Sequence, residues 1–419
     1  MIQSLRLENG LSVIVEEIGH VESAAYDLLV PGGLISDPDS AVGSSLIFAE
    51  LLGRGAGSYD SRALSEAFDD AGIRHGEWTG MDRFGFSGSL IASKLPRALE
   101  LVSSMVQEPR LPEEEIENIR SVLLQDLVAL NDNPARRASV ELNRRYYPAP
   151  FNRSSLGDAA GLKATDRSRM LALHRELFGP QRAILSVAGK VKADEVFRLV
   201  ERLFGGWQGA PAQLPPFGRI SPHEYAHLEV DSAQAQIVLA SPSVKFGEEG
   251  YYAGKVAVSL LGSSMFGRLF MELREKRGLC YSVYARHGAN TSYGTVSAYV
   301  GTTPERAQES LDLLVGELER LKGSVTQAEL ARSKTNMQAS LVMGEESPGS
   351  RAASNATDWW LLGRVRSLKE VNDAISAVSL DDVDSFLSRH PFTPCTILTL
   401  GRAPLEVSSS VTKHRSQPA

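Results

Sequence analysis

The chain has 419 residues, of which 42% are hydrophobic and 23% are charged, and its formal net charge is −7. These values are ordinary for a globular protein, and the length favours two domains over one core. The acidic balance argues against a nucleic-acid-binding protein, two cysteines offer no disulfide framework, and no apolar run is long enough to span a membrane.

Predicted strands and amphipathic helices alternate along the first half of the chain. Residues 5–16 alternate around an Asn-Gly turn and predict a β-hairpin rather than a signal peptide. Residues 24–31 predict a strand, and residues 41–52 predict a buried helix that stops at Gly53. A strand is expected at residues 78–91. Because the start of the chain reads as folded structure without a transit peptide, we expect a cytoplasmic, bacterial protein.

The second half repeats the first, with related segments separated by close to half the chain length. The helix start at residues 95–98 returns at residues 303–307, and the strand end at residues 186–189 returns at residues 398–401. This pattern predicts a tandem duplication of one α+β unit. The predicted organisation is an N-terminal domain, a linker rich in Gly and Pro, a C-terminal domain and a disordered tail, at residues 1–206, 207–225, 226–406 and 407–419.

A charged helix end leads into a strand near residue 278. Residues 260–273 are apolar at helical spacing, Gly278 breaks the helix, and residues 281–286 alternate as in a half-buried strand. Arg274 and Tyr281 therefore flank a helix-to-strand turn, where a guanidinium and a phenol can both address the backbone of an extended ligand. The alternative is a solvated basic helix end beside an ordinary sheet tyrosine, and composition alone favours it.

The stretch from Ser263 to Tyr284 resembles the second-domain signature of the pitrilysin family of inverted zinc metallopeptidases. That family includes the mitochondrial processing peptidases and the core proteins of respiratory complex III. The resemblance implies an α+β fold of two homologous domains, each a largely antiparallel sheet covered by helices on one side, together forming one half of a metalloprotease clamshell. It also implies that Arg274 and Tyr281, seven residues apart, hold a peptide substrate.

Active members of the family carry H-x-x-E-H on the first-domain helix, where two histidines bind zinc and the glutamate is the general base. Aligned on Gly53, this motif falls on residues 46–50, and both histidines and the base are missing. The degenerate positions are Leu46, Ala49 and Glu50, together with Asp126 at the place of the downstream glutamate. The strand that grips substrate in active members is also altered, at residues 76–79. We therefore expect no metal and no cofactor in this chain.

A second pattern, His223-Glu224-Tyr225-Ala226-His227, spells the zincin motif H-E-x-x-H. Zinc binding by this motif needs a helix, but Pro222 precedes it and the following residues alternate as in a strand. On a strand, residues four apart are separated by about 13 Å and cannot share one ion. An independent zincin site at these residues is therefore the weakest of the functional hypotheses. Cys280 has no evident histidine base and is expected to be a buried thiol.

The resemblance implies a non-zinc-binding subunit of a heterodimeric metalloendopeptidase. In that hypothesis, this chain positions extended peptides with Arg274 and Tyr281, while a homologous partner subunit supplies the zinc and the general base, so activity requires the partner. Isolated copies are expected to form an inactive homodimer. The alternative is a catalytically inactive structural or peptide-binding homologue like the complex III core proteins. Neither hypothesis involves nucleic acid or a membrane.

Overall fold

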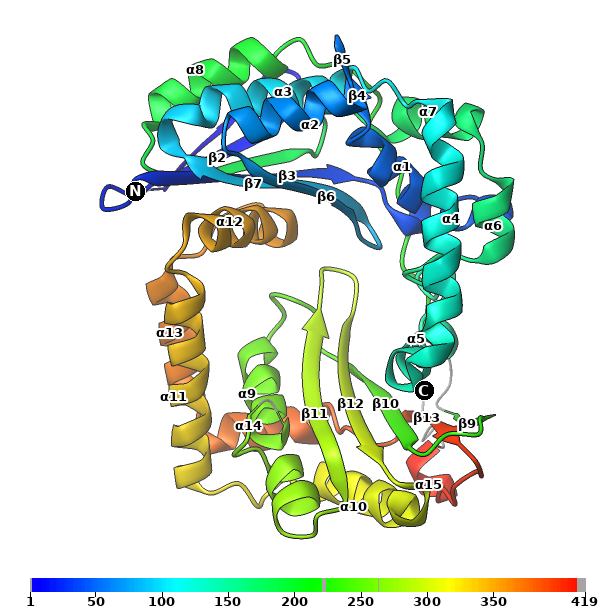
Figure 1. Ribbon diagram of the computed structural model, residues 1–419. Coiled ribbons are helices and arrows are strands. Elements are labelled where there is room, and N and C mark those ends of the chain that lie inside the picture. Colours follow the sequence, from blue (N-terminus) through cyan, green and yellow to red (C-terminus); the bar gives the residue numbers. More distant parts are fainter. Residues whose placement is uncertain (1, 221–223, 263, 413–419) are drawn as a thin grey trace. The chain divides into compact units, whose positions relative to one another are not determined.

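A computed structural model describes residues 2–220, 224–262 and 264–412. The chain divides into two compact units, each assembled from three separate segments (Figure 1). Unit 1 contains residues 1–129, 153–216 and 344–366, and unit 2 contains residues 130–152, 217–343 and 367–419.

Unit 1 is built on a six-stranded sheet with the order β1-β2-β8-β3-β7-β6. Strands β2 and β8 run parallel, and all other neighbours are antiparallel. The bounds are β1 (Ile2–Arg6), β2 (Ser12–Glu17), β3 (Ser23–Pro31), β6 (Arg74–Thr79), β7 (Arg83–Ile91) and β8 (Ile184–Gly189), with a small ribbon of β4 (Gly55–Ala56) and β5 (Tyr59–Asp60).

The helices of unit 1 come mostly from the first half of the chain. They are α1 (Ser44–Leu52), α2 (Ser61–Asp70), α3 (Leu95–Gln107), α4 (Glu113–Ala129), α6 (Ala159–Ala164), α7 (Arg167–Leu177), α8 (Ala193–Phe204) and α12 (Pro348–Leu362), with short 3₁₀ turns η1 (Leu34–Ser36), η2 (Asp39–Ala41) and η3 (Ala92–Lys94). Helix α8 presents Val196, Leu199 and Val200 to the core and charged side chains to solvent, as an amphipathic surface helix should.

Both faces of the central strands are covered, because β2, β3 and β8 place alternate side chains in two apolar layers. Leu28 and Val30 pack into the large core beneath α1, α3 and α8. Leu29 points the other way and packs with Ala356 of α12. Figure 1 shows α2, α3 and α8 on one face and α12 on the other. The sequence predicted helices on one face of the sheet, and the structure adds α12 on the other face.

Unit 2 contains a five-stranded sheet with the order β11-β12-β10-β13-β9. Strands β9 and β13 run parallel, and the other neighbours are antiparallel. The bounds are β9 (Tyr225–Glu229), β10 (Ala235–Ser243), β11 (Cys280–Ala289), β12 (Gly294–Thr302) and β13 (Thr396–Gly401).

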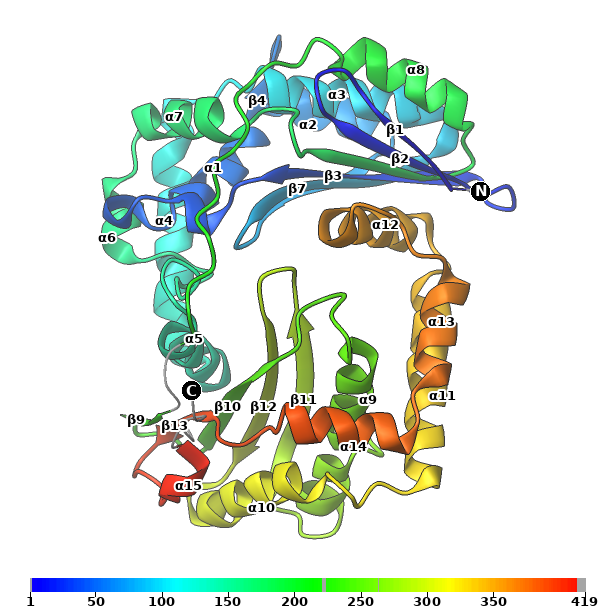
Figure 2. The same cartoon turned by 180° about the vertical axis from the view of Figure 1, so that it is seen from behind.

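The helices of unit 2 again cover two faces. Leu239 belongs to the larger core, while its neighbour Val238 packs with Leu142 of α5. Figure 2 shows α14 crossing the strands of this sheet. The helices are α5 (Pro134–Tyr146), α9 (Tyr251–Gly262), α10 (Ala307–Arg320), α11 (Gln327–Gly344), α13 (Leu368–Ala377), α14 (Leu380–Arg389) and α15 (Ser409–Thr412), with the short turns η4 (Leu130–Asp132) and η6 (Pro304–Arg306) and the π-helix η5 (Phe270–Glu275). No helix in the described part of the chain is both long and apolar enough to cross a membrane.

The strand order confirms the predicted α+β duplication, because β2-β8-β3-β7-β6 repeats as β9-β13-β10-β12-β11 with the same directions. The halves also exchange one helix each: α5 comes from the first half and joins unit 2, while α12 comes from the second half and joins unit 1. The predicted domains, residues 1–206 and 226–406, are contiguous and therefore do not contain this exchange of helices. One unit boundary, after Pro216, falls inside the predicted linker 207–225.

The predicted disordered tail, residues 407–419, differs from the structure in its first part. Residues 409–412 form α15, and Val411 is buried in the core of unit 2. The Cys395 backbone N–H donates to the Val411 carbonyl at 2.8 Å. A single apolar residue in a serine-rich segment was too weak a signal to predict this contact. Residues 413–419 lie outside the described residues.

Candidate functional site

The positions aligned with the zinc motif lie on α1 in unit 1. Leu46 is half-buried, Ala49 is buried at 6% exposure, and Glu50 is exposed. The remaining expected ligand position, Asp126, lies on α4 and is exposed. Zinc in proteins is held by thiolate, imidazole or carboxylate ligands, usually four of them. Leucine and alanine supply none, and Glu50 offers one carboxylate only, so the residues of α1 do not fit a zinc ion.

No cluster of three or more His, Cys, Asp or Glu side chains with metal-binding geometry occurs in residues 2–220, 224–262 and 264–412. Next to α1, the edge strand β6 carries His75 and Glu77, whose Nδ1 and Oε1 atoms are 3.1 Å apart. The ring of His75 stacks on Phe68, with centroids 3.7 Å apart. This histidine is therefore held by protein groups.

The zincin-like pattern is excluded as a helical site by its secondary structure. His223 lies outside the described residues, but Glu224 and His227 are described. His227 belongs to β9, which pairs in parallel with β13. Its Nδ1 lies 2.9 Å from the Thr399 hydroxyl. The strand that was predicted here is the one observed, so the zincin hypothesis fails.

The second predicted site lies in unit 2, where the chain passes through the π-helix η5. The Lys276 N–H donates to the Met271 carbonyl, five residues earlier, at 3.0 Å. The Leu279 N–H reaches back to the Leu273 carbonyl at 2.8 Å and closes the turn. A π-helical turn widens the helix by one residue and re-aims its side chains. Leu273 is fully buried in the core and anchors the segment.

Tyr281 is exposed by an irregularity in the strand that follows. Cys280 pairs with Thr302 and Ser282 pairs with Gly301, so Tyr281 is an extra residue in β11. Such a β-bulge leaves one residue unpaired and turns its side chain out of the regular alternation. The Tyr281 side chain is 81% exposed, although tyrosines in sheets are usually half-buried.

The structure brings Arg274 and Tyr281 together. The Arg274 guanidinium carbon lies 5.3 Å from the centroid of the Tyr281 ring and 4.9 Å from the ring of Phe270. Both distances fall within the range of cation–π attraction. Both rings thus lie next to the guanidinium, and among the described residues no carboxylate lies at ion-pair distance from it. Five donors and a phenol hydroxyl thus stand next to one another.

Arg268 connects the start of this segment to α11. The sequence analysis did not identify this residue. Its Nε and Nη2 donate to the two carboxylate oxygens of Glu329 on α11, at 2.9 and 3.0 Å. The guanidinium lowers the pKa of Glu329 to about 2. Phe270 was also not recognised as a partner of Arg274. The spacing of four residues on a helix was the available signal.

Cys280 does not contribute a nucleophile to this site. The thiol is 8% exposed, and burial raises its pKa to about 11. A thiol with so high a pKa carries very little thiolate near neutral pH. The prediction of a buried, inert thiol agrees with this environment.

The sheet edge beside these residues is open. β11 is the last strand of its sheet and pairs with β12 on one side only within the described residues. Its ten residues offer backbone N–H and C=O groups to an added strand. Farther along β11, the Arg286 guanidinium lies 4.4 Å from the Tyr284 ring. The site thus combines an unpaired edge with cationic and aromatic side chains.

Two family models match the chain. Residues 12–158 match Insulinase (Peptidase family M16), and residues 165–337 match the Peptidase M16 inactive domain. The uncharacterized zinc protease YmxG of Bacillus subtilis is 26% identical over 406 residues, which are 96% of this chain and 98% of that protein. An uncharacterized zinc protease of Rickettsia bellii is 23% identical over 94% of this chain and 96% of its own length.

Two solved structures share the fold across nearly the whole chain. A peptidase M16 inactive domain from Pseudomonas fluorescens aligns with a TM-score of 0.86 at 20% identity, covering 97% of this chain and 99% of that one. A protease from Helicobacter pylori aligns with a TM-score of 0.87 at 19% identity, covering 96% and 99%. With both family models and the fold in agreement, the chain belongs to peptidase family M16, as a member that lacks the zinc motif.

Proposed function

We propose that this protein is the non-zinc-binding subunit of a two-subunit M16 peptidase and that it positions extended peptides for a zinc-bearing homologous partner. The main support is the contact between Arg274, which is half-buried on η5, and Tyr281, which is exposed at the start of the edge strand β11; the family resemblance had paired these two residues. In this role, the guanidinium donates to a peptide carbonyl or carboxylate, and the phenol donates to the neighbouring carbonyl.

The unpaired edge of β11 supports the extended conformation of the ligand. A peptide that adds as a strand satisfies its own backbone groups against the edge, and its side chains then alternate between two sides. Tyr281 stands out of the strand at its start and Arg286 lies farther along. A bound strand therefore passes a phenol and a guanidinium as it runs along the edge.

The chemical step requires a partner because α1 lacks both histidines and the general base of the zinc motif. Leu46 and Ala49 cannot bind a metal or act as a base. Several relatives are named zinc proteases, whereas this chain has lost H-x-x-E-H. A homologous chain with the intact motif would supply zinc, its ligands and the general base. The isolated chain is then expected to have no peptidase activity of its own.

Peptide binding by the isolated protein tests the role of the pair. A fluorescent peptide of extended sequence should lose about tenfold or more in affinity for the Arg274→Ala variant, since hydrogen bonds from a charged donor are worth about 1.5–3 kcal/mol. Tyr281→Phe should lose less, because it removes one neutral donor. Arg277→Ala is the matched control: it lies on the same turn but pairs with Glu272. Equal affinity of all four proteins would remove the proposed role.

The partner is tested by affinity purification from the native cells, followed by native mass spectrometry and zinc analysis. A co-purifying chain with H-x-x-E-H, one zinc per pair and peptidase activity that falls with Arg274→Ala would support the two-subunit enzyme. Peptide binding without such a partner or any activity would instead support the alternative, an inactive peptide-binding or structural homologue.

A further inference from the structure

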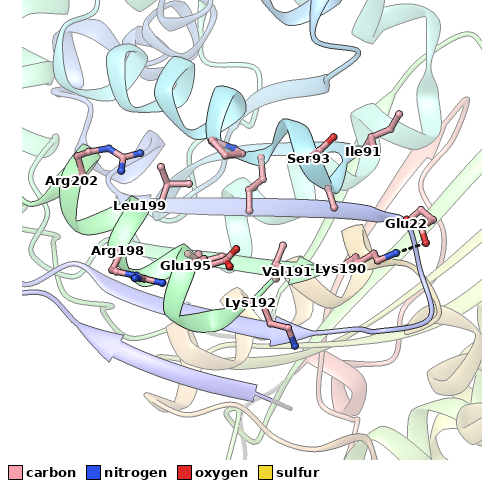
Figure 3. A pocket seen from close by; sticks show the side chains of 14 residues that line it. Glu22, Ile91, Ser93, Lys190, Val191, Lys192, Glu195, Arg198, Leu199 and Arg202 are labelled. Carbon is pink, nitrogen blue, oxygen red and sulfur yellow. Dashed lines mark hydrogen bonds and ion pairs between the residues drawn. The ribbon is translucent and has the colours of Figure 1, made fainter.

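A groove in unit 1, on the helical face of the sheet, has no role in the proposed function. It encloses about 750 Å³, within the range of small-molecule sites. Its walls come from the start of α3, the loop after β8 and one side of α8 (Figure 3). Leu95, Val196 and Leu199 form a buried apolar floor, and Ile91 contributes an apolar side chain that is 67% exposed.

Some of the charged side chains around the groove have an ion-pair partner and others do not. Four basic and two acidic side chains line it: Lys190, Lys192, Arg198, Arg202, Glu22 and Glu195. The Lys190 ammonium pairs with Glu22, and the Lys192 ammonium lies 3.1 Å from Glu17, outside the groove. The rim is therefore positive on a chain whose net charge is −7.

The two arginines are the unneutralised part of this rim. Arg198 donates from Nε to the Asp194 backbone carbonyl at 3.1 Å, which leaves the rest of its guanidinium fork to solvent. Within residues 2–220, 224–262 and 264–412, no carboxylate lies at ion-pair distance from Arg198 or Arg202. Four residues apart on α8, the two side chains project from the same helix face.

The two unpaired arginines lie at one end of the groove. In Figure 3, Arg198 and Arg202 lie toward one end, whereas Ile91 lies toward the other, beside the neutralised pair of Lys190 and Glu22. The geometry points to a ligand with a matching asymmetry. We infer that this groove binds a free amphipathic carboxylate, with its anionic head on Arg198 and Arg202 and its unbranched apolar chain over Leu95, Leu199 and Ile91.

This arrangement follows from the chemistry of both ends. A guanidinium fork matches the two oxygens of a carboxylate, and two forks on one helix face offer the head group several charge-assisted hydrogen bonds. The buried floor removes the chain from water, a gain that grows with each methylene. The inference is independent of the proposed peptide role, because none of these residues belongs to η5 or β11.

The test is a binding series on the full chain with octanoate, decanoate and dodecanoate, each kept below its micellar concentration, followed by calorimetry or NMR. Affinity should rise by up to about fifteenfold for each added pair of methylenes, since each buried methylene contributes up to about 0.8 kcal/mol, or about fourfold. Decylammonium, with the same chain and the opposite charge, should bind at least tenfold more weakly than decanoate.

Two variants locate the site. Arg198→Gln with Arg202→Gln should weaken decanoate about tenfold, and Ile91→Asn should flatten the chain-length dependence without a folding cost, since Ile91 is exposed. Arg175→Gln with Arg182→Gln is the control with the same charge change on exposed residues outside the groove. The inference would be overturned if both double variants lost the same affinity for decanoate, or if decylammonium bound as tightly as decanoate. Binding to anionic phospholipid vesicles but not to free decanoate would also overturn it.

Discussion

The two sheets have the same strand order, yet their edge strands β6 and β11 differ in one inserted residue. Strand β6 pairs regularly with β7, and its His75 is stacked on Phe68 and hydrogen-bonded to Glu77. Strand β11 contains the bulge at Tyr281, which leaves this side chain 81% exposed next to Arg274. The comparison shows how two copies of a duplicated unit can differ: one extra residue at an edge strand turns an aromatic side chain toward solvent.

A second difference lies beneath the exchanged helices. Under α12 in unit 1, Asp27 of β3 faces Ser186 of β8, and Asp27 Oδ1 and Ser186 Oγ have no hydrogen-bond partner among the described residues. The corresponding pair under α5 in unit 2 is Val238 and Leu398, which is apolar and packs with the helix. Unit 1 therefore buries an unsatisfied carboxyl where unit 2 buries hydrocarbon, and burial raises the pKa of Asp27 to about 6.

The largest effect is expected from restoring donors to α1. Leu46→His combined with Glu50→His places two imidazoles one turn apart on the helix, where both can reach one ion. Zinc affinity should rise about hundredfold over the natural protein, because the helix that carries the motif is present and regains both imidazole ligands. Competitive titration against a chelating dye measures it. Glu50→His alone is the control, and a double variant no better than this control would show that the helix no longer faces a usable metal position.

Asp27→Asn should stabilise the protein at pH 7 by about 2 kcal/mol, because the raised pKa is a cost of keeping the buried carboxylate ionised. In the natural protein, stability falls as pH rises from about 4 to about 6, where Asp27 ionises more readily in the unfolded chain. That decline should disappear in the variant. Urea unfolding at pH 4 and pH 7 measures both values; an equal pH slope in the two proteins would assign the decline to other groups.

Glu329→Gln should destabilise unit 2 by about 1.5 kcal/mol at pH 7, a value reduced for partial exposure to solvent. Arg268 lowers the pKa of Glu329 to about 2, so the ion pair contributes its full stability above pH 4.5 and loses it as pH falls toward 2. The variant and the natural protein should therefore converge only below about pH 2, where Glu329 is protonated in the folded protein as well. A constant difference between them across this range would mean that packing, rather than charge, holds the turn.

Gly278→Ala should cost about 1 kcal/mol, since Gly278 has φ of 61° and a side chain there is strained although no atom lies near the added Cβ. The same substitution at Gly288 on β11 also meets no neighbour and has no positive φ, so it should cost nothing. Thermal unfolding compares the two variants. If the two costs are equal, the turn conformation does not need glycine, and the placement of Tyr281 depends on the bulge alone.

Local chemistry explains which parts of the molecule the sequence predicted. The helix breaks at Gly278 because glycine readily adopts a positive φ. Residues 281–286 alternate because one face of their sheet is packed. These two patterns predicted that Arg274 lies at a helix end and Tyr281 in a strand. The loss of the zinc motif was equally evident, because residues 46–50 contain no histidine and alanine replaces the general base.

The sequence by itself thus determined the α+β duplication, the family and the loss of the zinc motif on α1. Only the tertiary structure decided that α5 and α12 change places, that Phe270 and Tyr281 enclose Arg274, and that Arg198 and Arg202 stand unpaired above an apolar floor. The reason is physical: periodicity reports which face of an element is buried, but not which distant element buries it, and a bulge or an unpaired cation exists only in relation to neighbours that lie far away in the sequence.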